Sequence, residues 1–461
     1  MRLTIPEEEL MTSGHKGCQG CAATLAMRYA LKALGNETII VIPACCWTVL
    51  EGEFPYTCMR VPLLHTAFET AASASAGVRA ALKVKGKDNV NVMAWAGDGG
   101  TFDIGLQALS GAVERNDDFF YVCYDNEGYM NCLSMSSMIL TKHGLKRITD
   151  VIMGEDVYAF DQNTHQLVLK ECAGVFDNGI KDIYEIQTLH HSIKATGNHP
   201  FLILKTNGSS KENGFVWRTL EELKIGNKVV AIKDGIASNG NMIEENNCKS
   251  DDSDNSLTNN KYFKTEEIES ITYVGKEQTL DLRVEGEHNF IADGIVVHNT
   301  GIQRSSSTPY GAWTTTTPVE AFESSHKKNI MEIMAAHDIP YAATACVAYP
   351  EDLVKKMQKA KDIRGSKFIH ILAPCSPGWR FPTGQTINIA RLAVETCIFP
   401  LYEVENGKYT VSRKPKKKPV KEYLEVQGRF KHLTDEIIGQ IQARVDKTWE
   451  KLLKKEEDTK G

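Results

Sequence analysis

The chain has 461 residues, a formal net charge of −6 and a pI near 6.1. It is long enough for two or three domains with their own cores, and its acidic balance argues against a nucleic-acid or anionic-membrane surface as its main role. It has no long apolar run and no signal peptide, which favours a cytoplasmic protein. Its twelve cysteines therefore indicate metal, cluster or nucleophile chemistry rather than disulfides.

The first 130 residues predict alternating helices and strands. Residues 22–34 have the periodicity of an amphipathic helix, and residues 38–43 that of a buried strand. The next expected elements are a helix at about 67–83, a strand at 90–96, a helix at 102–115 and a strand at 119–124. A Gly-Asp-Gly-Gly turn follows the strand at 90–96. This order is typical of a parallel βαβ unit, which binds its ligand at the carboxyl ends of the strands.

The character of the sequence changes between residues 132 and 299. Short β-rich runs alternate there with turn residues, without helical periodicity. Residues 234–260 are polar and of low complexity, and we expect them to be disordered. After residue 300 the α/β pattern returns, with helices expected near 318–336, 350–361 and 433–456 and a strand at 368–373. The sequence thus predicts an all-β domain (132–299) inside an α/β domain (1–131 with 300–461).

The ends of the β-rich insert carry the residues that protein splicing requires. The insert begins with Cys132 and ends with His298-Asn299, and the hydroxyl residue Thr300 follows it. Cys132 would attack the Asn131 carbonyl to form a thioester, and Thr300 Oγ would then capture the upstream segment. Asn299 would cyclise and cut the downstream junction. Removal of the insert joins YDNEGYMN to TGIQRSSSTPYG as a continuous motif.

Motifs inside the insert resemble those of inteins. Thr196-Gly-Asn-His199 resembles the TxxH block, in which His199 polarises the scissile amide and protonates the leaving nitrogen. Asp281 and His288 match the block that couples the two junctions, and His298 is expected to activate the neighbouring asparagine. No dodecapeptide of the LAGLIDADG kind is present. The insert is therefore identified as a mini-intein of the all-β Hint type, without DNA-cleaving function.

The turn at Gly97-Asp98-Gly99 matters because Asn126 follows the next predicted strand. Proteins hold a diphosphate through Mg²⁺, which prefers octahedral oxygen ligands. Asp98 offers a carboxylate, Asn126 a side-chain oxygen and Gly128 a backbone carbonyl. An ordinary strand-ending turn explains the Gly-Asp-Gly alone, but not the position of the asparagine. The pattern predicts the metal and diphosphate site of a thiamine diphosphate enzyme.

Without the insert, the chain resembles the β subunits of pyruvate:ferredoxin oxidoreductases (pyruvate synthases) over essentially its whole length. The matching motifs are GCQGCA (17–22), IPACC (42–46), GDGG (97–100), DNEGYMN (125–131) continuing into TGIQRS (300–305), and APC (373–375). The resemblance implies a thiamine diphosphate-binding α/β fold, a parallel sheet with helices on both faces. It also implies the reversible reaction of pyruvate, coenzyme A and oxidised ferredoxin to acetyl-CoA, CO₂ and reduced ferredoxin.

The resemblance implies the cofactor contacts as well. Asp98, Asn126 and the Gly128 carbonyl would ligate Mg²⁺, and Asn131 would face the reacting end of the cofactor. Further contacts are implied for Ala44, Cys45, Cys46, Trp47, Gly97, Gly99 and Gly100. The glutamate that activates the aminopyrimidine, and the residues that bind the pyruvate carboxylate, belong to a partner subunit in this family. Partners of α, γ and δ type and ferredoxin are therefore expected.

A metal site is indicated by the CxxC motif at Cys18 and Cys21, which alone suits either zinc or a four-iron four-sulfur cluster. The resemblance implies a cluster held by Cys18, Cys21, Cys46 and Cys375, with Cys45 as the alternative third ligand. A cluster fits thiamine chemistry because electrons must leave one at a time, and zinc cannot accept them.

Two other interpretations remain open on the sequence. A related oxidoreductase acting on 2-oxoglutarate or a branched-chain oxoacid would carry the same motifs. A Hedgehog-like autoprocessing module on a zinc-binding scaffold would lack the His-Asn-Thr junction seen here. Since the insert interrupts the cofactor loop, the unspliced chain is also expected to bind thiamine diphosphate poorly.

Overall fold

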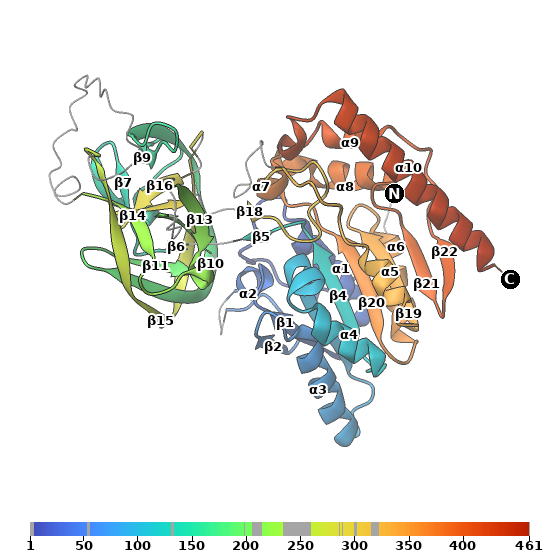
Figure 1. Cartoon of the computed structure of the whole chain (residues 1–461). Helices are drawn as coiled ribbons and strands as arrows, with labels where there is room; N and C mark the ends of the chain where they lie inside the picture. The colour runs from blue at the N-terminus through green and yellow to red at the C-terminus, as the bar shows by residue number, and fades with distance from the viewer. Residues whose placement is uncertain are drawn as a thin grey trace. The chain divides into compact units, whose positions relative to one another are not determined.

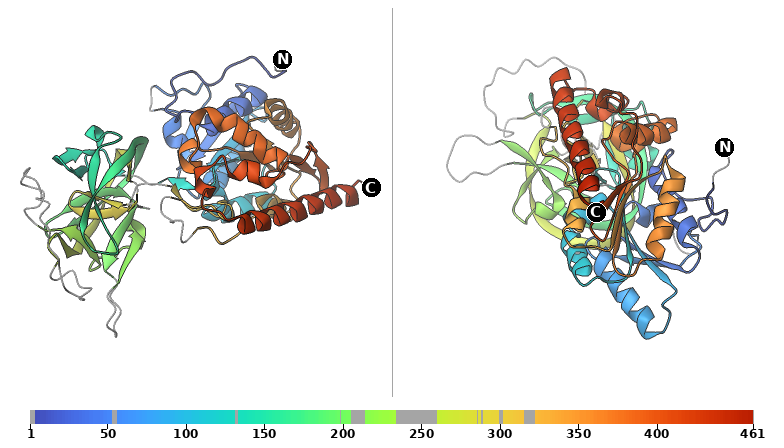
Figure 2. Two further views of the ribbon diagram at one scale, coloured as in Figure 1. Left: turned by 90° about the horizontal axis from the view of Figure 1, so that it is seen from above. Right: turned by 90° about the vertical axis from the view of Figure 1, so that its right-hand side faces the viewer.

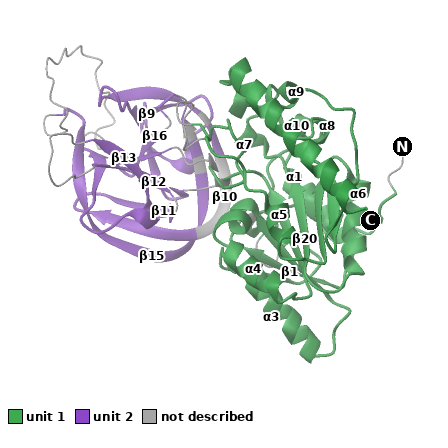
Figure 3. Ribbon diagram, turned by 45° about the vertical axis from the view of Figure 1, so that its right-hand side comes forward, with its two compact units in different colours: residues 1–129, 304–461 green, residues 130–303 purple. Residues whose placement is uncertain are grey.

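The computed structural model describes residues 4–52, 56–130, 133–197, 199–204, 214–233, 260–284, 286–287, 289–298, 302–314 and 322–460. The chain forms two compact units (Figure 3): the host unit, Met1–Tyr129 with Arg304–Gly461, and the insert unit, Met130–Gln303. Several predicted features lie outside the described residues: Asn131, Cys132, His288, Asn299, Thr300 and the segment 234–259. No helix in the described ranges has both the length and the apolar character needed to cross a bilayer.

An eight-stranded sheet forms the centre of the host unit, in the order β2-β1-β3-β4-β20-β19-β21-β22 (Figure 1). The first six strands are parallel to one another. Strand β21 then pairs antiparallel with β19, and β22 pairs antiparallel with β21. The strands are β1 (Thr38–Pro43), β2 (Leu63–Thr66), β3 (Asn91–Gly97), β4 (Phe120–Asp125), β19 (Tyr341–Cys346), β20 (Lys367–Leu372), β21 (Tyr402–Glu405) and β22 (Lys408–Val411). Strand β4 precedes the insert and β20 follows it, yet they are direct neighbours. The two parts of the host unit therefore form one sheet.

Helices cover both faces of this sheet (Figures 1 and 2), as predicted. Successive side chains of a strand point to opposite faces, so Trp95 lies in one core while Ala94 and Ala96 lie in the other. The first core includes residues of α1 (Ala22–Leu34), α6 (Pro350–Lys361) and α8 (Thr386–Glu395). The second includes residues of α3 (Ala71–Val84), α4 (Leu106–Glu114), α5 (Ile330–Ala335) and α10 (Asp435–Asp458).

Most predicted host elements form within a few residues of their expected bounds, with two corrections. The helix expected at 102–115 is preceded by a π-helical turn, Gly99–Asp103, and becomes α-helical only at Leu106. The prediction of a helix near 318–336 is wrong for residues 322–329, which form no helix or strand. Helix α5 starts after Asn329, whose side chain accepts a hydrogen bond from Glu332 N and so caps the helix. The short helices α2 (Trp47–Leu50), α7 (Ser376–Trp379) and α9 (Val420–Leu424) were not predicted.

The described insert unit is built on a twelve-stranded sheet with two short 3₁₀ turns. Its longest strands, β10 (Leu167–Thr188) and β15 (Phe263–Val284), have 22 residues each and pair antiparallel. Short strands were expected here, but register shifts such as that between Cys172 and Gly174 let one strand bend and continue. The other strands are β6 (Leu133–Ser134), β7 (Met138–Thr141), β8 (Gly144–Arg147), β9 (Asp156–Phe160), β11 (Ser192–Thr196), β12 (Pro200–Leu204), β13 (Phe215–Thr219), β14 (Lys228–Ile232), β16 (Asn289–Ala292) and β17 (Ile295–His298).

Two further strands flank the insert in the sequence. Strand β5 (Tyr129–Met130) and strand β18 (Ile302–Gln303) pair in a two-stranded sheet. The segments that precede and follow the insert are thus hydrogen-bonded neighbours in the unspliced chain.

Candidate functional site

The three predicted metal ligands come together at the carboxyl end of the host sheet. Asp98 follows β3 and Asn126 follows β4, which are adjacent parallel strands. Both side chains are buried. One terminal atom of the Asn126 amide lies 2.8 Å from Asp98 Oδ1 and 3.1 Å from the Gly128 carbonyl oxygen. The spacing of the sequence motif is therefore matched by convergence in space.

This arrangement fits Mg²⁺. Adjacent oxygens of an octahedral Mg²⁺ site with bonds of about 2.1 Å lie roughly 3 Å apart. Asp98, Asn126 and Gly128 can present three oxygens at this separation. Burial, and after it the nearby Asp125 carboxylate, raise the pKa of Asp98 to about 7, so a bound cation would stabilise the charged form of Asp98.

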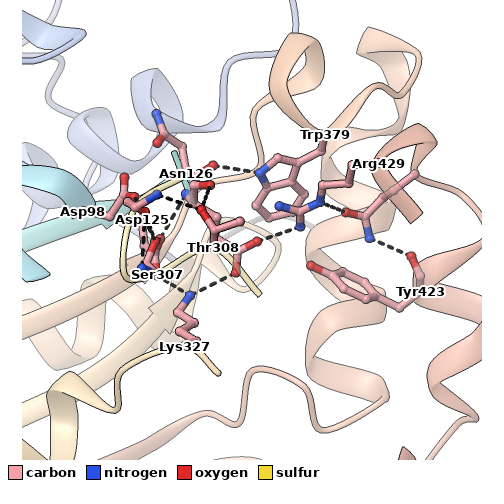
Figure 4. A network of polar contacts seen from close by, with 12 residues as sticks. Asp98, Asp125, Asn126, Ser307, Thr308, Lys327, Trp379, Tyr423 and Arg429 are labelled. Atoms are coloured by element: carbon pink, nitrogen blue, oxygen red, sulfur yellow. Dashed lines mark hydrogen bonds and ion pairs between the residues drawn. The ribbon is translucent and has the colours of Figure 1, made fainter. Parts of the chain in front are cut away.

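Two serines of the segment that follows the insert hold these carboxylates (Figure 4). Ser305 Oγ donates to Asp98 Oδ2 at 2.6 Å. Ser307 Oγ lies 2.8 Å from both Asp98 Oδ2 and Asp125 Oδ1, so that its proton is shared between the two carboxylates. The position of Asp98 is thereby fixed by residues from the other side of the insert.

The backbone of the loop after β4 is held in the same way (Figure 4). Trp379 Nε1 donates to the Asn126 carbonyl at 2.7 Å, and Thr308 Oγ1 donates to the Glu127 carbonyl at 2.9 Å. Glu127 has a φ of 61°, a left-handed conformation that non-glycine residues rarely adopt. These contacts keep the loop in the strained conformation that turns Asn126 and Gly128 toward Asp98.

A buried ionic network completes the support of this loop. Lys327 Nζ lies 2.5 Å from Asp125 Oδ2 and 2.9 Å from Glu127 Oε1. Arg429 pairs with Glu127 at 2.6 Å, and His370 Nε2 lies 2.7 Å from Asp125 Oδ2. Burial lowers the pKa of Lys327, but the two facing carboxylates outweigh burial and raise it above its ordinary value. This network was not predicted from the sequence, because the only local indication of it is the presence of charged residues near strand ends.

The four predicted cluster cysteines come together from three segments. Burial, with smaller contributions from the thiols of Cys46 and Cys18, raises the pKa of Cys21 to about 12. Burial likewise raises the pKa of Cys375 well above its ordinary value, again with contributions from the other three thiols. None of the four forms a disulfide with another described residue. In the described ranges, no group of three or more His, Cys, Asp or Glu side chains is arranged to bind a metal ion in this structure.

Cys45 faces a different neighbour from Cys46. The Cys45 side chain hydrogen-bonds to Tyr124, whose pKa is raised by burial first and then by the adjacent thiols. Cys46 Sγ instead lies 3.9 Å from Asn126 Nδ2 and contributes to the electrostatic environment of Cys21. The choice between Cys45 and Cys46 as the cluster ligand stays a prediction.

The remaining predicted cofactor contacts have different surroundings. Ala44 is exposed, whereas Trp47 is fully buried and packs edge-on against Trp95 at 6.0 Å. Gly97, Gly99 and Gly100 are buried in the turn after β3. A Cβ atom on Gly97 would approach the Tyr124 hydroxyl to 3.2 Å, so little space is available for a side chain. The cofactor roles of these residues stay predictions.

In the insert unit, the structure brings together His199 and His298. His199 is fully buried, and neither of its ring nitrogens has a hydrogen-bond partner among the described residues. Burial first, and then the neighbouring His298, lower the pKa of His199 to about 3. His298 packs edge-on against Trp217 at 4.8 Å. Among the described residues, the His199 imidazole is thus neutral near pH 7 and has no hydrogen-bond partner.

The start of the insert lies among the other predicted splicing residues. Leu133, which follows Cys132, pairs with Ala195 of β11 and with Leu280 of β15. Thr196 and Asp281 are the next residues of those two strands. Leu133 thus pairs with both strands that carry these motifs, whereas Cys132 lies outside the described residues.

Comparisons with known proteins found matches for both units of the chain. Residues 46–150 match the family model "Thiamine pyrophosphate enzyme, C-terminal TPP binding domain", and residues 138–299 match "Intein splicing domain". The chain is 36% identical to ketoisovalerate oxidoreductase subunit VorB of Pyrococcus abyssi, covering 98% of this chain and 95% of the relative. It is 34% identical to pyruvate synthase subunit PorB of Methanothermobacter thermautotrophicus, covering 98% and 99%. A crystal structure of a DnaB intein from Synechocystis sp. PCC 6803 is 25% identical over 37% of this chain and 98% of that one, with a TM-score of 0.28.

The fold and the site define a thiamine diphosphate-binding subunit interrupted by an intein splicing domain. The chain belongs to the family of 2-oxoacid:ferredoxin oxidoreductase beta subunits.

Proposed function

We propose that the spliced chain is the beta subunit of a pyruvate:ferredoxin oxidoreductase. It binds thiamine diphosphate through Mg²⁺, holds one four-iron four-sulfur cluster, and takes part in the reversible conversion of pyruvate and coenzyme A to acetyl-CoA and CO₂. The observation that carries this proposal is the convergence of Asp98, Asn126 and Gly128, with the thiol of Cys46 on the other side of the same asparagine.

Each part of the host site has a definite task in this proposal. Asp98, Asn126 and the Gly128 carbonyl hold Mg²⁺ and thereby the diphosphate, while Ser305 and Ser307 orient the Asp98 carboxylate. When bound, thiamine diphosphate supplies the carbanion chemistry that decarboxylates a 2-oxoacid.

Electron transfer is assigned to the cysteine group. Cys18, Cys21, Cys46 and Cys375 would hold a four-iron four-sulfur cluster, which would supply one-electron transfer toward ferredoxin. Subunits of α, γ and δ type complete the enzyme and supply the residues that bind the oxoacid carboxylate. This assembly works in the cytoplasm.

A ketoisovalerate oxidoreductase is the second candidate. The similarity to the Pyrococcus abyssi subunit, 36% against 34% for the pyruvate synthase subunit, favours it. The assembled complex decides between them: kcat/KM is measured with pyruvate, 2-oxoisovalerate and 2-oxoglutarate under identical anaerobic conditions. A higher kcat/KM for either of the last two would overturn the assignment to pyruvate.

We further propose that the insert, residues 132–299, excises itself. The Cys132 thiolate attacks the Asn131 carbonyl carbon, the peptide C–N bond breaks and a thioester forms. Thr300 Oγ then attacks the thioester and releases the thiol.

The downstream junction is cut in the next step. The Asn299 side-chain nitrogen attacks the Asn299 backbone carbonyl carbon and the peptide C–N bond to Thr300 breaks. The insert leaves with a C-terminal succinimide, and Thr300 gains a free amino group. The ester at Thr300 finally rearranges to a peptide bond. His199 polarises the upstream amide, and His298 assists at the downstream junction.

Intact-mass spectrometry after anaerobic expression tests the splicing proposal. We expect a ligated host of residues 1–131 joined to 300–461, together with a free insert of residues 132–299. Persistence of the 51.2 kDa chain under reducing conditions would contradict it. Iron, sulfide and thiamine diphosphate contents of the ligated host then test the cofactor assignment.

A further inference from the structure

The side chain of Asn126 faces two different sites with its two ends. One terminal atom of its amide lies 2.8 Å from Asp98 Oδ1 and 3.1 Å from the Gly128 carbonyl oxygen. The amide nitrogen lies 3.9 Å from Cys46 Sγ when the oxygen is turned toward those two groups. A planar amide therefore stands between a predicted Mg²⁺ ligand set and a predicted cluster ligand.

The two orientations of this amide satisfy different partners. With nitrogen toward Asp98 and Gly128, the NH₂ group donates to both oxygens, and the amide oxygen faces Cys46. With oxygen toward them, three acceptor oxygens face one another, which is unfavourable unless a cation lies between them. Only in this second orientation does the nitrogen donate to Cys46 Sγ. The amide cannot serve both arrangements at once.

We propose that Asn126 couples occupancy of the Mg²⁺ site to hydrogen bonding at Cys46. Binding of Mg²⁺ with thiamine diphosphate selects the orientation in which the oxygen ligates the metal and the NH₂ group donates to the sulfur. This inference rests on the proposed function, because it takes Cys46 as a cluster ligand. Asn126 is then a positioning residue for electron transfer as well as a metal ligand.

The coupling has a defined sign. A hydrogen bond to a cluster sulfur stabilises the more negative, reduced state of the cluster and raises its midpoint potential. The cluster therefore becomes the better electron acceptor when the cofactor is loaded. Loss of the hydrogen bond in the unloaded site makes the cluster harder to reduce.

Pulsed electron paramagnetic resonance on the spliced, assembled enzyme tests this coupling directly. The protein is labelled with ¹⁵N at asparagine side chains, its cluster is reduced, and ¹⁵N hyperfine coupling is recorded before and after addition of Mg²⁺ and thiamine diphosphate. We expect an added coupling on loading and a positive shift of the cluster potential. An unchanged coupling in enzyme with full iron and cofactor contents would overturn the inference.

The variant Asn126→Asp supplies the matched control. It keeps an oxygen ligand for Mg²⁺ but has no N–H donor, so the added coupling should be absent from it. The change in cluster potential on loading should also be smaller than in the wild type, because the bound charges affect both proteins and only the hydrogen bond differs. Equal changes in the two proteins would contradict the coupling. A chain that binds no iron would instead overturn the cluster assignment of the proposed function.

Discussion

Arg429 and Glu127 form an ion pair of 2.6 Å in which both side chains are almost completely buried. They are 302 positions apart in the sequence, and the insert lies between them. The pair is nevertheless made in the unspliced chain. Arg429 also lies over the Trp379 ring at 4.0 Å, and Trp379 donates to the Asn126 carbonyl. The loop that carries the proposed Mg²⁺ ligands is thus held by residues from downstream of the insert before excision.

The substitution Lys327→Met should destabilise the spliced host. It leaves the buried carboxylates of Asp125 and Glu127 without the cation between them, which costs about 3–5 kcal/mol for a broken buried pair. The free energy of unfolding from denaturant titration measures this, and thiamine diphosphate affinity should fall with it.

The neighbouring Lys328 is the control for this substitution. Its side chain is 43% exposed and pairs with Asp103 at 3.3 Å, so Lys328→Met should cost at most about 1 kcal/mol. Equal losses for the two lysines would show that the network does not support the loop.

The variants Cys46→Ala and Cys45→Ala should differ in iron content. Removal of Cys46 takes one of four converging thiols, so we expect loss of the cluster. Cys45 instead hydrogen-bonds to Tyr124, and its removal should leave iron and sulfide near wild-type amounts. Chemical analysis of anaerobically purified protein distinguishes them, and the reverse result would make Cys45 the ligand.

The variant His199→Gln should slow splicing by about 10²–10⁴-fold, the range for loss of a general acid–base group. The expected observation is accumulation of the 51.2 kDa precursor in a time course followed by mass spectrometry. His143, an exposed residue of the same unit, provides the control, since His143→Gln should splice at the wild-type rate. Normal splicing of the first variant would remove His199 from the mechanism.

The insert unit should lose stability in mild acid because of His199. Its pKa is lowered by burial from 6.5 to about 3, so the unfolded state binds the proton first as the pH falls. The contribution of His199 to the free energy of unfolding is fully present above pH 6.5 and is lost progressively between pH 6.5 and about 3. At pH 5 the loss amounts to about 2 kcal/mol.

Amide hydrogen exchange of β10 and β15 measures this pH dependence in the full chain made splicing-inactive by Cys132→Ala and Asn299→Ala. Asp293, whose pKa is raised by burial to about 6, acts in the opposite direction as the pH falls. A second protein carries His199→Phe in addition. The difference in amide exchange between the two proteins gives the contribution of His199 at each pH. Parallel pH profiles for the two would contradict the assignment.

The same splicing-inactive chain should be catalytically dead and bind thiamine diphosphate more weakly than the spliced host. Asp98, Asn126 and Gly128 already converge in the unspliced chain, so the deficit is expected at Asn131, beside the insert. Isothermal titration with Mg²⁺ and thiamine diphosphate measures it. Equal affinities would show that the cofactor loop tolerates the insert.

The parts of the site that could be predicted from the sequence are those whose residues lie close together along the chain. Gly97-Asp98-Gly99 and Asn126 follow adjacent parallel strands, so their convergence could be predicted from strand order. The partners Lys327 and Arg429 could not, because a charged residue carries no local signal of a distant buried carboxylate. The sequence predicted only short β-rich runs in the insert, because the bulges that let β10 and β15 continue over 22 residues depend on tertiary pairing.

The pairing of β5 with β18 bears on the ligation step itself. Two chain ends that diffuse freely must find each other, and closing the gap costs entropy that increases with the length of chain between them. Here the chain near each end, Tyr129–Met130 and Ile302–Gln303, lies in two paired strands, and β4 and β20 hold the sequences beyond them in one sheet. The host thereby raises the effective molarity of the two ends to be joined, as a template does for an intramolecular reaction. Excision then changes covalent connectivity while the sheet that surrounds it keeps its pairing.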